Sequence, residues 1–233
     1  MENYKKNLEL LTKNHVYSKE MEHDACGVGL IASTEGKKSR AIVEYGIEAL
    51  KAVWHRGAVD ADGKTGDGAG IHVEIPKDFF IEKIQVTGHD YDNSEICVGM
   101  IFLPRNDYSA QESCKTIVES ELTKNNFSIY GWRQVPVNSK VLGEKALQTM
   151  PEIIQVLFKP NDPNLLDKNL ERKIYEIRKR IENKAFDASL NNFYICSISS
   201  KSIIYKGLYL AESLSDFYFC LLYTSPSPRD GIG

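Results

Sequence analysis

At Cys26 the sequence changes abruptly from polar to apolar. Residues 1–25 are polar with no clear apolar period, whereas CGVGLIA (26–32) is typical of a short buried strand. The glycines at 27 and 29 leave little side-chain bulk around the cysteine. Two interpretations of Cys26 are open at this point: a buried structural residue, as most single cysteines are, or a reactive thiol at the start of a strand.

Strands and helices follow one another without a strict β-α-β alternation. Apolar runs and alternations predict strands at 71–75, 95–104, 127–137, 152–158, 192–199 and 202–210, the last two as a hairpin around Ser200-Lys201. Helical periods predict helices at 41–54, at 109–122, at 143–150 and along a face of Leu170, Ile174, Ile177 and Ile181. The order favours antiparallel sheets with helices outside them, an α+β fold.

The helix at 41–54 leads into a segment rich in turn residues. Gly57 is a plausible end of the helix, and DADGKTGDGAG (60–70) contains four glycines and three aspartates. We expect this segment to be loop, with Asp60 and Asp62 forming turns. Farther along, Ser109 and Glu112 have the spacing of a capping box at the start of the 109–122 helix.

Charge and cysteine content exclude several classes of protein. The net charge of −3 and the absence of a basic stripe argue against a nucleic-acid or membrane-surface partner. The N-terminus lacks the apolar stretch of a secretory signal. Five scattered cysteines fit neither a disulfide framework nor a zinc site, so no metal is predicted and the cytoplasm is the simplest compartment.

Removal of the leader would give Cys26 its own base. If the peptide bond between Ala25 and Cys26 is cut, Cys26 carries both a thiol and a free α-amine. An α-amine has a pKa near 7.7–8.0 and can accept the proton of a thiol whose unperturbed pKa is about 8.5. Nucleophile and base then belong to one residue. Cys97, Cys114 and Cys196 fall within predicted strands or a helix and are expected to be buried apolar residues.

Several blocks of sequence resemble one enzyme family. In order, these are CGVGLIA, HRGAVDADGKTGDGAGIHVEIP, YGWRQVPVNSKVLGEKAL, RKRIE and FYICSISSKSIIYKGLYL. Together they resemble the N-terminal glutaminase domain of glutamate synthases, a branch of the class II glutamine amidotransferases, over residues 22–219. The TGDGAGI and YKG motifs and the leader before the cysteine favour glutamate synthase over other branches.

The resemblance implies a fold and a reaction. The family fold is the four-layer αββα sandwich of the N-terminal-nucleophile hydrolases, which would be incomplete at the C-terminal end of this chain. Residues 1–25 would be a propeptide. The Cys26 thiolate would attack the side-chain amide of glutamine, releasing ammonia and then glutamate.

The resemblance also assigns site residues. Arg56 and Gly57 belong to an HRG motif beside the nucleophile, where Arg56 adds positive field that favours the thiolate. Without the resemblance, the plainer interpretation is that Arg56 and His55 lie at the C-terminal end of a helix, where they interact with its last carbonyls and its dipole. Asp67 would border the glutamine pocket, although a turn cluster is the plainer interpretation of its loop.

The resemblance ends near Phe219. The family's RFSTNT and HNGE segments, which hold the substrate carboxylate and form the oxyanion hole, do not occur in this sequence. Because loss of one oxyanion donor can cost about 10²–10³ in rate, we expect this fragment to be inactive alone. Residues 26–219 would be a partial amidotransferase domain. Ser-Pro-Ser-Pro-Arg predicts an unstructured tail at 220–233, either a native linker or sequence foreign to the gene.

The full-length enzyme implied by the resemblance carries the remaining chemistry. Ammonia would pass to a downstream synthase domain with FMN and an iron–sulfur cluster, and a small subunit is a possible partner. This fragment itself would need no cofactor. The electron donor (NADPH, NADH or ferredoxin) and the oligomeric state stay open. The alternatives are a fragment of another class II amidotransferase, of the amidophosphoribosyltransferase type, and a non-catalytic domain with a structural Cys26.

Overall fold

Two antiparallel sheets form the centre of the protein. The computed structural model describes residues 6, 9–10, 12–13, 27–36, 38–53 and 57–222. One sheet has four strands in the order β3-β4-β2-β5, and the other pairs β1 with β6. The strands are β1 (Ala69–Glu74), β2 (Cys97–Leu103), β3 (Phe127–Gln134), β4 (Glu152–Pro160), β5 (Tyr194–Ser199) and β6 (Ser202–Gly207). The α+β class expected from the sequence is confirmed.

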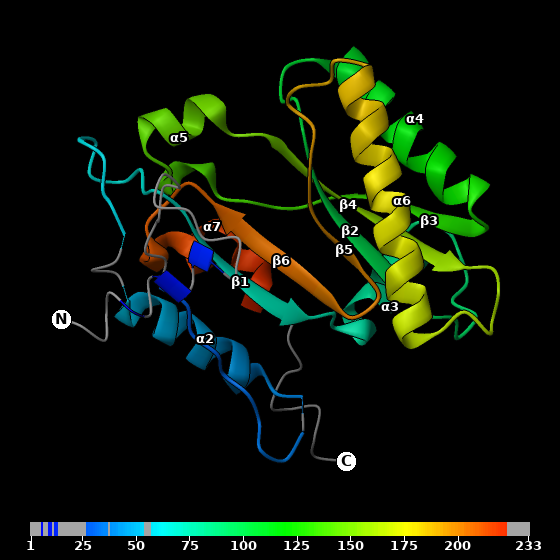
Figure 1. Ribbon diagram of the computed structural model, residues 1–233, viewed down its shortest axis with the longest axis horizontal. Helices are drawn as coiled ribbons and strands as arrows, with labels where there is room; N and C mark the ends of the chain where they lie inside the picture. The colour runs from blue at the N-terminus through cyan, green and yellow to red at the C-terminus, as the bar shows by residue number, and fades with distance from the viewer. Residues whose placement is uncertain are drawn as a thin grey trace.

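Helices cover the outer sides of both sheets. They are α2 (Arg40–Ala52), α3 (Lys77–Val86), α4 (Tyr108–Lys124), α5 (Glu144–Thr149), α6 (Asp167–Asp187) and α7 (Leu214–Phe217), with 3₁₀ turns η2 (Ser139–Val141), η3 (Ala211–Ser213) and η4 (Phe219–Leu222). In Figure 1, α4 and α6 lie side by side along the four-stranded sheet, and α2 lies below β1 and β6.

The face of α6 predicted from the sequence packs onto the four-stranded sheet. Leu170, Ile174, Ile177 and Ile181 are all buried, and they share a core with Phe158 of β4. Burial of one such aliphatic side chain stabilises the fold by about 1.5–3 kcal/mol, whereas the surface pair between Arg178 and Glu182 contributes about 0–1 kcal/mol. Apolar packing therefore fixes α6 in place.

A second core lies on the side of α3, β1 and β6. Its buried members include Phe80 and Ile84 of α3, Ile203 and Tyr205 of β6, and Met100 of β2. The α2 helix is held close to β1, since a Cβ atom on Gly46 would lie 3.1 Å from Cδ1 of Ile71. Sequence analysis did not predict α3, because its apolar residues do not form a clean helical stripe.

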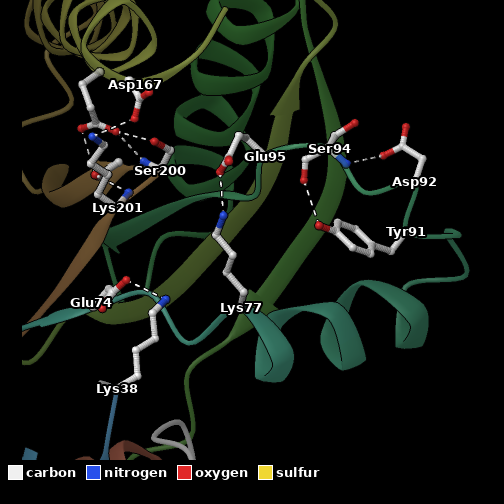
Figure 2. Close-up of polar contacts among 12 residues, drawn as sticks. Lys38, Glu74, Lys77, Tyr91, Asp92, Ser94, Glu95, Asp167, Ser200 and Lys201 are labelled. Carbon is white, nitrogen blue, oxygen red and sulfur yellow. Dashed lines mark hydrogen bonds and ion pairs between the residues drawn. The ribbon is translucent and has the colours of Figure 1, made fainter. Parts of the chain in front are cut away.

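The prediction that a hairpin forms around Ser200-Lys201 is wrong. β5 and β6 are consecutive, but β5 pairs with β2 and β6 pairs with β1, so the chain turns a corner from one sheet to the other. Side chains replace the backbone hydrogen bonds that would join β5 and β6 in a hairpin. The Ser197 hydroxyl accepts a hydrogen bond from the N–H of Ile204 at 3.1 Å. Glu171 accepts hydrogen bonds from the Ser200 N–H and hydroxyl, both at 2.7 Å. Figure 2 shows Ser200 and Lys201 at the corner.

Residues 27–32 do not form the strand that was predicted there. No strand is assigned to them, and Val28 and Leu30 are 89% and 90% exposed. A strand needs a neighbour for its backbone hydrogen bonds, and in the described residues β1 pairs with β6 alone. The apolar residues of this segment therefore lie beside the sheet without joining it.

The N-cap of α4 and the state of residues 220–222 both differ from the predictions. Asp107, rather than Ser109, caps α4 by accepting the N–H of Ala110 at 2.9 Å, and the helix begins at Tyr108. Residues 220–222 were expected in an unstructured tail, but they belong to η4, where Cys220 and Leu221 are 5% and 1% exposed. Their apolar side chains complete the second core; residues 223–233 lie outside the described residues.

Candidate functional site

A groove runs between the segment after Cys26 and α2. It has a volume of about 1080 Å³, and its lining includes Gly27, Leu30, Val43, Val53 and Ile71. Lys38 forms an ion pair of 2.6 Å with Glu74, which ties the entry to α2 to the end of β1 (Figure 2). Gly27 follows Cys26 in the sequence, and Val53 precedes Arg56 by three residues.

The segment expected to be loop forms a small hairpin over residues 58–67. The N–H of Asp60 donates to the carbonyl of Thr65 at 2.9 Å, and the N–H of Asp67 donates to the carbonyl of Ala58 at 3.3 Å. Val59 and Gly66 form an antiparallel bridge between them. The hairpin starts directly after Gly57 and returns directly to β1, so it sets the positions of Gly57 and Asp67 together.

Asp62 organises the tip of this hairpin. One carboxylate oxygen accepts the N–H groups of Lys64 and Thr65 at 2.9 and 2.7 Å, and the other accepts the Thr65 hydroxyl at 2.6 Å. The bond from the Thr65 hydroxyl is the main cause that holds the pKa of Asp62 well below its ordinary value. The expectation that Asp62 forms a turn is confirmed, and the turn is held by an ionised side chain.

Asp67 lines a second cavity, of about 600 Å³. This cavity includes Tyr194, Lys206 and Leu208, and it shares Gly70, Ile71 and His72 with the groove. Lys206 donates to the Tyr194 hydroxyl at 2.6 Å and lies over its ring. The two cavities are therefore neighbours along β1.

The predicted site residues have different outcomes. Gly57 and Asp67 are both exposed and are brought together by the hairpin. Neither belongs to the lining of the groove that contains Gly27. Cys26 and Arg56 lie outside the described residues, so their roles stay predictions.

The four described cysteines are poor nucleophiles. Cys97, Cys114, Cys196 and Cys220 are all buried and carry free thiols. Burial raises the pKa of Cys114 and of Cys196 to about 11, and it also raises the pKa of Cys97 and Cys220. The prediction that Cys97, Cys114 and Cys196 are buried apolar residues is confirmed, and none of the four favours a thiolate at neutral pH.

The described part of the chain offers neither a metal-binding cluster nor a membrane-spanning helix. Nowhere in it do three or more His, Cys, Asp or Glu side chains come together as a group that could bind a metal ion. Among its helices, none is both long enough and apolar enough to cross a bilayer.

Sequence reasoning missed the residues that hold the hairpin from outside. Lys145 pairs with Asp60 at 2.6 Å although 85 residues separate them. Gly143 lies against Asp62 and Thr65. No local pattern in the sequence relates these positions. The one hint was that LGEKAL (142–147) and TGDGAG (65–70) both belong to the sequence blocks that resemble the glutaminase domain.

Comparisons with known proteins identify relatives over most of the chain. It is 53% identical over 219 residues to the glutamate synthase (NADPH) large chain of Azospirillum brasilense, covering 94% of this chain and 14% of that protein. It is 39% identical over 211 residues to the chloroplastic ferredoxin-dependent glutamate synthase of Spinacia oleracea, covering 88% of this chain and 13% of that protein. The chain thus spans only a small part of the length of these relatives.

A family model describes the same region. The model of the class II glutamine amidotransferases matches residues 26–225, so the match begins at Cys26 and includes the groove, the hairpin and both sheets. This chain therefore belongs to the class II glutamine amidotransferases.

Proposed function

We propose that this chain is the N-terminal glutaminase part of a glutamate synthase, and that it hydrolyses glutamine to glutamate and ammonia at Cys26. The observation that carries the proposal is that the family match begins at Cys26, while Gly27 lines the large groove. The relatives named above, both glutamate synthases, favour this branch over the amidophosphoribosyltransferase type.

Cys26 would act as the first residue of the mature domain. After residues 1–25 are removed, its α-amine takes the proton of its thiol, and the thiolate attacks the carbonyl carbon of the glutamine side-chain amide. The C–N bond breaks, and the amine returns the proton to the departing ammonia. Water then cleaves the thioester, giving glutamate and the free thiol. The raised pKa values of the buried cysteines support Cys26 as the nucleophile, because they disfavour the alternatives.

Arg56, Gly57 and Asp67 would form the wall of the site that faces Cys26. Arg56 would add positive charge that favours the thiolate, and Gly57 and Asp67 would border the bound glutamine. The hairpin supports this assignment, because it fixes Gly57 and Asp67 relative to each other. Val53 at the end of α2 supports it too, since it lines the same groove as Gly27.

The two sheets would be an incomplete form of the αββα sandwich. Helices α4 and α6 would be one outer layer and α2 the other, with residues 26–219 as the partial domain and residues 1–25 as the propeptide. Within the described residues β1 pairs with β6 alone, and this edge together with the exposed Val28 and Leu30 supports the view that further strands are needed. By this account the fragment alone lacks the substrate clamp and the oxyanion hole and is inactive.

The remaining chemistry would belong to the rest of a longer enzyme. The described cysteines do not fit an iron–sulfur cluster, because they form no ligand group with one another. We place that cluster, FMN and the synthase reaction in the downstream domain, with the whole enzyme in the cytoplasm and a small subunit as a further partner.

Covalent labelling tests the proposal. The complete enzyme that contains this segment is treated with diazo-oxo-norleucine, a glutamine analogue whose diazoketone alkylates a nucleophilic cysteine, and peptides are analysed by mass spectrometry. We expect one adduct, on Cys26, that free glutamine suppresses and that Cys26→Ser abolishes. Cys114→Ser is the matched control and keeps the adduct. A Cys26 that is never labelled would mean that this is a non-catalytic domain with a structural cysteine.

A further inference from the structure

Two regions far apart in the sequence meet at the 58–67 hairpin and α5. A Cβ atom on Gly143, the residue before α5, would lie 2.2 Å from Oδ2 of Asp62 and 2.2 Å from Oγ1 of Thr65. The same Cβ atom would lie 2.6 Å from the backbone nitrogen of Thr65, which cannot move aside as a side chain can, so glycine is needed for the start of α5 to approach the hairpin tip this closely. Figure 1 shows the two lying next to each other, the hairpin segment in cyan and α5 in light green.

Charge and hydrogen bonding join the two regions as well. The Asp62 carboxylate binds Lys64 and Thr65, and the backbone of Glu144 in the first turn of α5 also helps to lower its pKa. Lys145, the next residue of the helix, donates to Asp60 at 2.6 Å. The ion pair and the close approach of Gly143 thus join the hairpin to α5, and we call Asp60, Asp62, Thr65, Gly143 and Lys145 the hairpin latch.

The opposite side of the hairpin is held by backbone. A Cβ atom on Gly66 would lie 2.6 Å from the carbonyl oxygen of Tyr209, so this leg of the hairpin lies directly against the chain that follows β6. Gly66 and Thr65 are both buried. The hairpin is therefore fixed between α5 and the segment after β6, and it cannot shift toward either without a clash.

We propose that Asp62 is a positioning residue of the glutamine site, acting through the hairpin latch. The hairpin connects Gly57 to Asp67, so a rigid connection to α5 holds these two proposed site residues at a fixed place. The inference rests on the proposed function, because it concerns the same site. Asp62 itself does not touch the substrate.

The reasons for a positioning role are geometric. Asp62 lies at the tip of the hairpin, whereas Gly57 and Asp67 lie at its base, and the two legs are joined by backbone hydrogen bonds at both Asp60 and Asp67. Loss of the tip contacts would let the hairpin tilt as a unit. A displacement of about 1 Å at a catalytic site can cost about 10²-fold in rate, so a small tilt is enough to matter.

The test separates positioning of glutamine from reactivity of the thiol. Two reagents are applied to the complete chain: diazo-oxo-norleucine, which must bind as glutamine does, and iodoacetamide, which needs only an accessible thiolate. For Asp62→Ala we expect labelling of Cys26 by the glutamine analogue to slow by about 10-fold or more. The rate at which iodoacetamide alkylates Cys26 should stay within about twofold of the rate in the unmodified chain, because this reagent needs only an accessible thiolate.

Three variants complete the design. Asp62→Asn keeps one acceptor oxygen and should give an intermediate rate with the analogue. Gly143→Ala perturbs the same junction from the α5 side while the chain keeps its Asp62 carboxylate, and it should reproduce the loss. Asp162→Ala is the matched control, because Asp162 makes the same kind of bond to the N–H of Asn164, at 2.9 Å, in the connection between β4 and α6. In Asp162→Ala, both reagents should label Cys26 at the same rates as in the unmodified chain.

Each other outcome overturns the inference. Equal rates for Asp62→Ala and the unmodified chain with both reagents would show that the latch does not position the site. An equal loss with both reagents would show a general structural defect. If the unmodified chain itself reacts with iodoacetamide at Cys26 but never with the analogue, the proposed function fails, and the inference fails with it.

Discussion

The Ser200 hydroxyl and the Glu171 carboxylate are 2.7 Å apart at the corner where the chain passes from one sheet to the other. The same carboxylate oxygen accepts the N–H of Ser200, and the other accepts the Ser199 hydroxyl at 2.9 Å. Because the two strands at this corner pair with different partners, no ladder supplies these hydrogen bonds. One side chain from α6 therefore fixes how the two sheets are joined.

Removal of this carboxylate should weaken the fold. Glu171→Ala leaves the Ser199 and Ser200 donors without their acceptor, which costs about 1–3 kcal/mol of unfolding free energy. Urea denaturation of the 233-residue chain, followed by circular dichroism, measures the change. Glu176→Ala is the control, because Glu176 is exposed on the same helix, and it should change stability by less than about 0.5 kcal/mol. Equal stability of the two variants would contradict the role assigned to Glu171.

Thiol labelling should separate Cys26 from the other four cysteines. A pKa of about 11 against an ordinary value of 9.0 reduces the thiolate fraction of Cys114 and Cys196 about 100-fold near neutral pH, and burial slows access further. In the native chain at pH 8, iodoacetamide should therefore label Cys26 first, as peptide mass spectrometry would show. In urea all five cysteines should react. Rapid native labelling of Cys114 or Cys196 would contradict the burial described above.

Acid should weaken the hairpin latch only at low pH. The pKa of Asp62 is lowered from 3.8, so the unfolded chain binds its proton more readily than the folded chain. Its contribution to stability is therefore complete above about pH 4 and is lost as the pH falls through the lowered pKa. The urea midpoints of the unmodified chain and Asp62→Asn should differ most between pH 5 and 7 and converge toward pH 2. A constant difference down to pH 2 would contradict an ionised Asp62 in the folded state.

Local sequence patterns predicted the elements that depend on local packing. The Leu170, Ile174, Ile177 and Ile181 face lies in the core as expected, since a helical stripe has only one way to be buried. The β5–β6 hairpin was predicted wrongly, because strand pairing is decided by partners far away in the sequence. The strand expected at 26–32 failed for the same reason.

The candidate site was predictable only in part. The turn residues Asp60 and Asp62 were recognisable from their type, but their attachment to Lys145 and Gly143 spans about 80 residues and has no local signature. The assignment of Cys26, Arg56, Gly57 and Asp67 came from resemblance to a family, since a thiol that acquires its base by cleavage leaves no pattern in hydrophobicity or charge. Family membership is now established, while the individual roles of these residues stay predictions.

The central claim is that Cys26 becomes an N-terminal nucleophile, and the intact mass and N-terminal residue of the complete chain, purified from a cytosolic host, test it most directly. The account predicts a mature chain that begins at Cys26, with residues 1–25 removed, and a Cys26→Ala variant measured in parallel should show whether the cysteine itself is needed for that removal. A complete, folded chain that still begins at Met1 would contradict the claim, because Cys26 would then have no α-amine to act as its base.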